Sequence, residues 1–399
     1  MSRQTGFPLA GVRVLEFGQI AAGPFTGSLL ADLGADVVKV ERPDGGDGMR
    51  TWPPLSSKPG ENDVFSENFA SLNRNKRSLA LDLKDENDLE RLKALAAKCD
   101  VIVENFRPGV LQRLGLGYEA LRKTNLQLVY CSISGYGQTG PYAKKGAFDV
   151  TVQGMSGLMS VTGEDGAAPV KCGVPVGDFC AGLYAAYTIV AKLLQARDSG
   201  EGGYIDCSML GSLIGVAALQ TSEYFGTAHA PKPMGSAHPR NAPYQAFKAS
   251  DDYFIIAAGN DRLWTEVAEA VGLPDLAVDE RFSSQMLRAK NQAALVELLQ
   301  PRFETRTADE WLREMDGRGV PCSPINSYPE ILDNNEQTAH MGLVEPLTLP
   351  NGVETRTTAF PVAMSGYEFE IYRDPPELGA HNDEVFSDWL AAESNPEGF

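Results

Sequence analysis

The first half of the chain alternates between segments with the pattern of buried strands and segments with the pattern of helices. The strand-like stretches are short and apolar, whereas the stretches between them repeat apolar residues at helical spacing. This alternation predicts an α/β fold with a mainly parallel sheet that helices cover on both faces. The expected strands are 11–17, 36–42, 78–84, 100–106 and 126–134, and the expected helices include 24–35 and 86–99.

Ligands of such sheets bind at the loops that follow the carboxyl ends of the strands. The first of these turns, EFGQIAAGPFTG, has glycines at 18, 23 and 27, which do not match the GxGxxG spacing of a dinucleotide site. We therefore expect no nicotinamide or flavin site here. The small residues of this turn fit two interpretations equally: backbone N–H groups offered to a phosphate or adenine, or close packing of helix on strand.

The middle of the chain has a different character. Residues 223–244 are rich in glycine, proline, alanine and histidine without a strong period, which indicates a loop or linker. The strand-like stretch 252–259 and a helical run over 288–318 then predict a smaller α+β unit. The strand-like tail at 351–366 is expected to rejoin the first domain.

Composition limits the class of partner. The net charge of −18 argues against nucleic acid, because phosphate backbones are bound by basic surfaces. The six cysteines form no CxxC pair and the four histidines form no HExxH motif, so we expect neither a disulfide framework nor a metal site. The N-terminal residues lack the apolar core of a secretory signal, and we found no run of about 18 apolar residues. We expect a cytoplasmic protein without a membrane span.

Basic residues gather near the ends of the predicted strands. Arg42 ends the second strand, where a guanidinium suits a phosphate, although an exposed arginine before a proline turn is also consistent with the pattern. Further basic clusters lie in 73–78, 103–115 and 142–149. Three such clusters around one sheet edge of an acidic protein favour a polyphosphate pocket, and Phe106 among basic neighbours suits stacking on an adenine ring.

One carboxylate stands before a long, mostly apolar stretch, in the segment GVPVGDFCAG. An acid at this position, here Asp178, is most often a helix N-cap. The position also suits a nucleophile, because a helix N-terminus favours the ionised carboxylate that a nucleophile must be. Gly177 would leave room for a substrate close to the backbone. The residues alone leave both roles open.

The chain resembles the family III CoA-transferases, of the formyl-CoA transferase and carnitine CoA-transferase type, essentially from end to end. The segments that carry the resemblance are 8–47, 73–83, 103–118, 134–149, 173–186 and 238–247. The resemblance implies an α/β fold in which both chain ends, 1–222 and 333–399, form a large Rossmann-like parallel-sheet domain. It also implies a smaller α+β domain at 223–332 and an interlocked homodimer.

The resemblance also implies roles for individual residues. Asp178 matches the nucleophile of the family, which forms a covalent aspartyl intermediate. Gly235, His238 and Arg240 are candidate substrate residues, although MGSAHPR has only one glycine where some members have a glycine-rich loop. No metal is implied. Contacts with coenzyme A, which enters as a substrate thioester, carry over to Ala21, Ala22, Arg42, Leu81, Lys84, Asn105, Phe106, Arg107, Arg113, Lys145, Phe148 and Asp149.

The expected activity is transfer of CoA from succinyl-CoA, or a similar dicarboxylyl-CoA, to a carboxylic acid. The stretch GDGMRTWPP resembles members that handle dicarboxylates, and Arg240 could hold a second carboxylate. One alternative is an α-methylacyl-CoA racemase of the same fold, whose histidine would fall in KKGAFD, where this chain has Phe148 and no histidine. The other alternative is a non-catalytic acyl-CoA-binding subunit, against which the presence of Asp178 argues.

Overall fold

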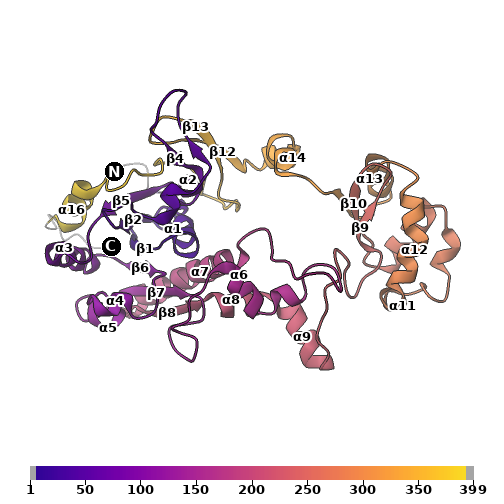
Figure 1. Ribbon diagram of the computed structural model, residues 1–399, viewed down its shortest axis with the longest axis horizontal. Coiled ribbons are helices and arrows are strands. Elements are labelled where there is room, and N and C mark those ends of the chain that lie inside the picture. The colour runs from indigo at the N-terminus through magenta and orange to yellow at the C-terminus, as the bar shows by residue number, and fades with distance from the viewer. Residues whose placement is uncertain (1–5, 392–399) are drawn as a thin grey trace. The chain divides into compact units, whose positions relative to one another are not determined.

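The structure, a computed structural model, describes residues 6–391. Within this range the chain forms two compact units (Figure 1). The first unit contains 6–158, 171–228 and 337–391, and the second contains 159–170 and 229–336. The first unit therefore combines residues from both ends of the chain. The expected division into a large CoA-binding catalytic domain, 1–222 with 333–399, and a small domain with linkers, 223–332, stays a prediction.

The first unit is built on a six-stranded sheet in the order β5-β2-β1-β6-β7-β8. Every neighbouring pair is parallel, and Leu15 pairs with Val38 on one side and with Ile102 on the other. The α/β class with a large parallel sheet is thus confirmed. The strands are β1 (Arg13–Phe17), β2 (Asp36–Glu41), β5 (Lys76–Ala80), β6 (Val101–Glu104), β7 (Val129–Ser134) and β8 (Gly203–Ser208).

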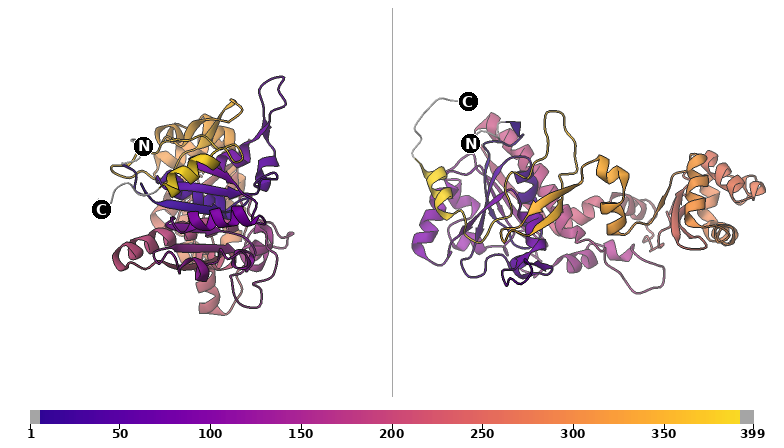
Figure 2. Two further views of the ribbon diagram at one scale, coloured as in Figure 1. Left: turned by 90° about the vertical axis from the view of Figure 1, so that its left-hand side faces the viewer. Right: turned by 90° about the horizontal axis from the view of Figure 1, so that it is seen from above.

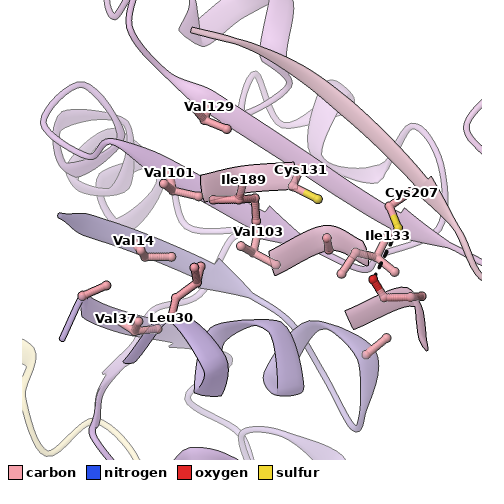
Figure 3. Close-up of a cluster of buried hydrophobic side chains, with 14 of the residues drawn as sticks. Val14, Leu30, Val37, Val101, Val103, Val129, Cys131, Ile133, Ile189 and Cys207 are labelled. Carbon is pink, nitrogen blue, oxygen red and sulfur yellow. Dashed lines mark hydrogen bonds between the residues drawn. The ribbon is translucent and has the colours of Figure 1, made fainter. Parts of the chain in front are cut away.

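Helices cover both faces of this sheet, as the two further views in Figure 2 show. Successive residues of a strand point to opposite faces. Val14 therefore packs in one buried cluster with Leu30 and Ile189 (Figure 3), whereas its neighbour Leu15 packs in the opposite cluster with Leu92. The first cluster involves α1 (Ala22–Asp32) and α7 (Val176–Ser199), and the second involves α3 (Glu86–Ala96) and α16 (Asn382–Leu390).

Two short hairpins and several short helices complete the first unit. Strands β3 and β4 pair with each other, as do β12 and β13, and both pairs are antiparallel. Their bounds, with those of the helices, are β3 (Leu55–Ser56), β4 (Phe65–Ser66), β12 (Val344–Thr348), β13 (Glu354–Thr358), α2 (Glu67–Asn73), α4 (Val110–Arg113), α5 (Tyr118–Leu121), α6 (Asp149–Met155), α8 (Met209–Val216), α9 (Ala218–Thr227) and a 3₁₀ helix (Gly48–Thr51).

The second unit has a three-stranded antiparallel sheet in the order β11-β10-β9. Its core is rich in aromatic side chains, among which Phe303 contacts the rings of Phe247, Phe254 and Trp311. The elements are β9 (Tyr244–Lys248), β10 (Tyr253–Ala257), β11 (Cys322–Pro324), α10 (Asp261–Ala270), α11 (Gln285–Lys290), α12 (Gln292–Phe303), α13 (Ala308–Gly317), α14 (Tyr328–Asp333) and a 3₁₀ helix (Pro274–Ala277). Two elements cross the unit boundaries: a 3₁₀ helix (Leu158–Ser160) and α15 (Glu336–His340).

Several expected boundaries differ from those in the structure. The strand expected at 78–84 is β5, which begins and ends earlier. The chain turns after it, where Asp85 N donates to Asp82 O at 2.9 Å, and the Asp85 carboxylate then caps α3 by accepting hydrogen bonds from the backbone N–H groups of Asn87 and Asp88. The linker expected to begin at 223 begins later, because α9 continues to Thr227. The helical run expected over 288–318 is divided among α11, α12 and α13.

Helix α7 is long and apolar enough to cross a membrane by length and composition, although the sequence has no unbroken apolar run of about 18 residues. The core helix of a globular protein passes the same test. In this fold the buried residues of α7 include Ala181, Ala185 and Ile189, which belong to the same hydrophobic cluster as β1, β6 and β7. One face of the helix is therefore part of the core of the first unit.

Candidate active site

The topological switch point of the sheet lies between β1 and β6. The strands that follow β1 in the chain, β2 and β5, are added on one side of it, whereas β6, β7 and β8 are added on the other side. Such a switch point leaves a crevice beyond the carboxyl ends of the two strands. A pocket of about 380 Å³ lies here, at the loops that follow β1, β6 and β7. Its lining includes Asp178 and the predicted CoA contacts Ala21, Ala22, Asn105, Phe106, Arg107, Lys145, Phe148 and Asp149.

Asp178 lies in the first turn of α7, as its third residue. The N-cap of this helix is Pro175, and no side chain caps it, so the alternative that Asp178 is an N-cap is wrong. The backbone N–H of Ala22, the first residue of α1, instead faces the Asp178 carboxyl closely enough to lower its pKa by hydrogen bonding, and both residues line the pocket. The carboxylate is thus close to the N-termini of two helices, both of which favour its negative charge.

The pKa of Asp178 is raised to about 6. Burial is the larger cause, because it removes water from the charged form, and the negative charge of Asp149 adds to it. The hydrogen bond from Ala22 N–H opposes both effects. Asp178 is therefore mainly ionised at neutral pH and yet more basic than an ordinary aspartate.

The carboxylate of Asp149, at the start of α6, accepts hydrogen bonds from its own helix and from the first turn of α7. One carboxylate oxygen accepts a hydrogen bond from the backbone N–H of Gly177 at 2.7 Å, and the other accepts one from Gln153 Nε2 at 2.6 Å. A Cβ atom at Gly177 would lie 2.9 Å from the nearer Asp149 oxygen, so this approach requires glycine. The CoA contact predicted for Asp149 stays a prediction, and its observed contacts are with the first turn of α7.

Asn105 fixes the turn that follows β1. Its amide oxygen accepts from Gln19 N at 2.9 Å, and its amide nitrogen donates to Gln19 O at 2.9 Å. Elsewhere in the pocket lining, Lys145 Nζ lies 5.8 Å from the ring centre of Tyr136, and Phe148 is 72% exposed. An exposed aromatic ring beside cationic groups suits a base and its phosphates.

Four predicted CoA contacts do not line this pocket. Arg42 is exposed and donates from Nε to Gly46 O at 3.1 Å, and Lys84 and Arg113 are also exposed. The Leu81 side chain is buried in the core cluster under α3. All four lie after the carboxyl ends of β2, β5 or β6, and their contact with CoA stays a prediction.

The three candidate substrate residues belong to the second unit. Gly235 has φ +59° and donates from its N–H to Gly163 O at 2.7 Å. The His238 ring packs on Tyr244 at 5.0 Å between ring centres, and its Nδ1 accepts from Arg240 N at 3.1 Å. Burial, and then the charge of Arg240, lower the pKa of His238. Their contact with substrate stays a prediction.

Sequence reasoning did not single out several residues of the pocket. Gln19, Tyr136 and Met209 follow strands of the sheet and line the pocket, as does Ser134, the last residue of β7. Their position at the carboxyl ends of strands could have identified them as pocket residues. This position alone is not specific, because polar and aromatic residues are common in such loops. The Tyr136 hydroxyl is buried and has no hydrogen-bond partner among residues 6–391.

No group of three or more potential metal ligands occurs in the described part of the chain. Within the pocket, the lining residues include no histidine. The racemase alternative requires an imidazole at the position of Phe148, and this chain has a phenyl ring there. The groups available for chemistry in this pocket are therefore the partly buried carboxylate of Asp178, nearby backbone N–H groups, and the positive charges of Arg107 and Lys145.

Comparison with known proteins identifies related sequences over nearly the whole chain. The family model described as CoA-transferase family III matches residues 9–382. The succinyl-CoA:glutarate CoA-transferase of Mus musculus is 39% identical over 96% of this chain and 86% of that protein. The succinate–glutarate CoA-transferase of Agrobacterium fabrum is 37% identical over 96% of this chain and 95% of that protein.

A solved structure has the same fold. The CAIB/BAIF family protein from Brucella suis is 39% identical to this chain and superimposes with a TM-score of 0.85. The match covers 96% of this chain and 99% of that chain. The similarity therefore extends over both compact units and includes the segments that form the pocket.

Proposed function

This chain belongs to CoA-transferase family III, and from that premise we propose that it transfers CoA from succinyl-CoA, or a similar dicarboxylyl-CoA, to a carboxylic acid. We propose that Asp178 carries the reaction covalently. The observation that supports this role most directly is its partly buried, ionisable carboxylate, held by Ala22 N–H at the switch point of the sheet. The names of the relatives from Mus musculus and Agrobacterium fabrum support dicarboxylate substrates.

The proposed reaction has four exchanges at carbonyl carbon. The Asp178 carboxylate attacks the donor thioester and expels CoA thiolate, which leaves an acyl-aspartyl anhydride. The thiolate then attacks the aspartyl carbonyl, so that the donor acid leaves and an aspartyl-CoA thioester remains. The acceptor carboxylate attacks this thioester, again expelling CoA thiolate and forming a new anhydride. Attack of the thiolate on the acceptor acyl carbon gives the product and restores Asp178.

The surroundings of Asp178 suit these steps. A raised pKa makes the carboxylate a better nucleophile while leaving it ionised at neutral pH. Its burial limits the access of water, which would otherwise hydrolyse the anhydride. Lys145 and Arg107 in the pocket lining supply positive charge for the phosphates of CoA in a protein whose net charge is −18.

We also propose that the chain acts as a homodimer in the cytoplasm. Large apolar side chains on α7 and in the segment that follows it are exposed in the single chain, including Leu183, Tyr187 and Leu194 on α7. Three such residues on one helix whose other face is in the core support the proposal that another chain covers this surface. The proposed occupant is a second copy of this chain, as expected for the family.

Trapping the intermediate tests the proposed chemistry. The protein is incubated with succinyl-CoA and then with hydroxylamine, and the modified peptide is mapped by mass spectrometry. We expect modification of Asp178 in the native protein and in Asp198→Ala, which changes an exposed acid on the same helix, and none in Asp178→Ala. Retained transfer activity in Asp178→Ala would contradict the proposal.

The substrates need a separate measurement. A panel of acyl-CoA donors and acids, followed by mass spectrometry, should give the highest kcat/KM for pairs of dicarboxylates. Exchange of the α-hydrogen of a branched acyl-CoA for deuterium without CoA transfer would instead support the racemase. Binding of acyl-CoA without transfer to any acid of the panel would support the non-catalytic subunit.

A further inference from the structure

Four charged side chains form a buried cluster behind the turn that joins β1 to α1. Glu16, Lys39 and Lys76 are fully buried, and Asp47 is 1% exposed. Lys39 Nζ lies 3.0 Å from Glu16 Oε1 and 2.9 Å from Asp47 Oδ2, while Lys76 Nζ lies 2.7 Å from Glu16 Oε2. Buried ion pairs contribute little to stability relative to apolar side chains of the same size, because both charges lose their water. Stability alone therefore does not account for the cluster.

Three members of this cluster bind the backbone of the turn or of the first residues of α1. Lys39 Nζ donates to Gly18 O at 2.7 Å, and Lys76 Nζ donates to Pro24 O at 2.7 Å. The carboxylate of Asp47 accepts a hydrogen bond from Ile20 N at 3.1 Å. The cluster thus holds the backbone at the beginning of the turn, in its middle and in the first turn of α1.

The middle of this turn has a strained backbone. Ile20 has φ +66°, in the left-handed region that a β-branched residue strongly disfavours. A residue keeps such a conformation only where its surroundings impose it. The imposed contact at Ile20 is the hydrogen bond to Asp47, whose charge is in turn held by Lys39.

The turn determines where the Ala22 N–H points. Ile20 and Ala22, two residues apart, line the same pocket as Asp178, and the Ala22 N–H lowers the pKa of the Asp178 carboxyl by hydrogen bonding. If Ile20 relaxed to an ordinary conformation, the direction of the chain entering α1 would change, and this hydrogen bond would weaken. The buried cluster is therefore connected to Asp178 through one short stretch of backbone.

We propose that Asp47 and Lys39 are positioning residues for the transferase site, because they hold Ile20 in its strained conformation and so direct Ala22 N–H at Asp178. The proposal rests on the proposed role of Asp178 as nucleophile. Neither Asp47 nor Lys39 lines the pocket, so their effect on catalysis is expected through the turn and not through contact with substrate.

Asp47→Asn tests the proposal, since it removes the charge that pairs with Lys39 and keeps the size of the side chain. We expect kcat to fall about tenfold, with KM for acyl-CoA little changed. We also expect the acid limb of the pH profile to move to higher pH, because the Ala22 hydrogen bond lowers the pKa of Asp178. Asp44→Asn, at an exposed acid of the same loop, should leave both unchanged.

A second substitution distinguishes positioning from a general loss of structure. Glycine adopts the left-handed conformation without strain, so Ile20→Gly should make the turn less dependent on Asp47. We expect the double variant Asp47→Asn/Ile20→Gly to recover part of the kcat, and the acid limb to return toward that of the Ile20→Gly variant alone. If Asp47→Asn does not fold, the same double variant should recover folding.

Three outcomes would overturn the proposal. They are a folded Asp47→Asn protein with native kcat and acid limb, a loss that Ile20→Gly does not reduce, and failure of both Asp47→Asn and the double variant to fold. Failure of the proposed function has a different signature, because transfer would then persist in Asp178→Ala whatever the behaviour of the Asp47 variants.

Discussion

At the scale of single residues, the charge of Asp178 reflects opposing influences. Burial and the nearby Asp149 carboxylate disfavour ionisation, whereas the Ala22 N–H favours it. The resulting pKa of about 6 lies between that of an exposed aspartate and neutral pH. An acid in this range combines nucleophilicity with a high ionised fraction under physiological conditions.

The pH dependence of transfer should report this value. Because the ionised carboxylate is the proposed nucleophile, kcat/KM should be constant above the pKa of Asp178 and fall about tenfold per pH unit below about 6. Steady-state rates between pH 5 and 8 measure this limb, with the stability of the protein checked at each pH. A limb near pH 4, typical of an exposed aspartate, would show that burial does not control the group.

Asp149→Asn should shift this limb in a known direction. The substitution removes the negative charge that raises the pKa of Asp178, and the amide oxygen can still accept from Gly177 N–H. We expect the acid limb to move to lower pH by a few tenths of a unit to about one unit. The matched variant Asp198→Asn, at an exposed acid at the far end of α7, should not move it. A shift to higher pH would contradict the assigned role.

At the scale of elements, α1 and α7 must approach closely for Ala22 to reach Asp178. Glycine at position 182 allows this approach, since a Cβ there would lie 2.7 Å from the Phe25 ring and 3.3 Å from Ala22 O. The contact with Ala22 O links helix packing to the same backbone segment that binds the carboxylate.

Gly182→Ala should therefore damage both stability and activity. We expect unfolding free energy to fall by about 1–3 kcal/mol, because the helices must separate to accept the methyl group. Denaturant unfolding measures this change, and the pH profile measures any effect on Asp178. Gly173→Ala is the control, since a Cβ at that position meets nothing within 4 Å. Equal stability of the two variants would mean that α1 and α7 do not require this contact.

At the scale of the whole molecule, the proposed dimer rests on the exposed apolar face of α7. Leu183→Glu and Tyr187→Glu place charges on side chains that are 52% and 59% exposed in the single chain. If a second copy covers them, light scattering should show the native protein as a dimer and the double variant as a smaller species or an aggregate. The same change at Leu126, an exposed leucine before β7, should leave the mass unchanged. A native protein that is monomeric would contradict the proposed dimer.

Local sequence patterns determined the class of fold. Alternating apolar strands and amphipathic helices have few arrangements other than a parallel sheet between helical layers, and this prediction was confirmed. The resemblance carried by several ordered segments determined the family, which the family model and relatives confirmed. The fold class and the family both follow from patterns within short segments of the sequence, so no coordinates were needed to predict them.

The surroundings of the proposed nucleophile were decided only by the tertiary structure. Asp149 is 28 residues from Gly177, and Asn105 is 86 residues from Gln19, yet each pair is joined by hydrogen bonds. The sequence placed Asp178 at the start of a helix but could not distinguish a cap from the first turn, nor reveal the N–H from α1. These contacts depend on strand order and on the approach of α1 to α7, because only folding brings such distant groups within hydrogen-bonding distance.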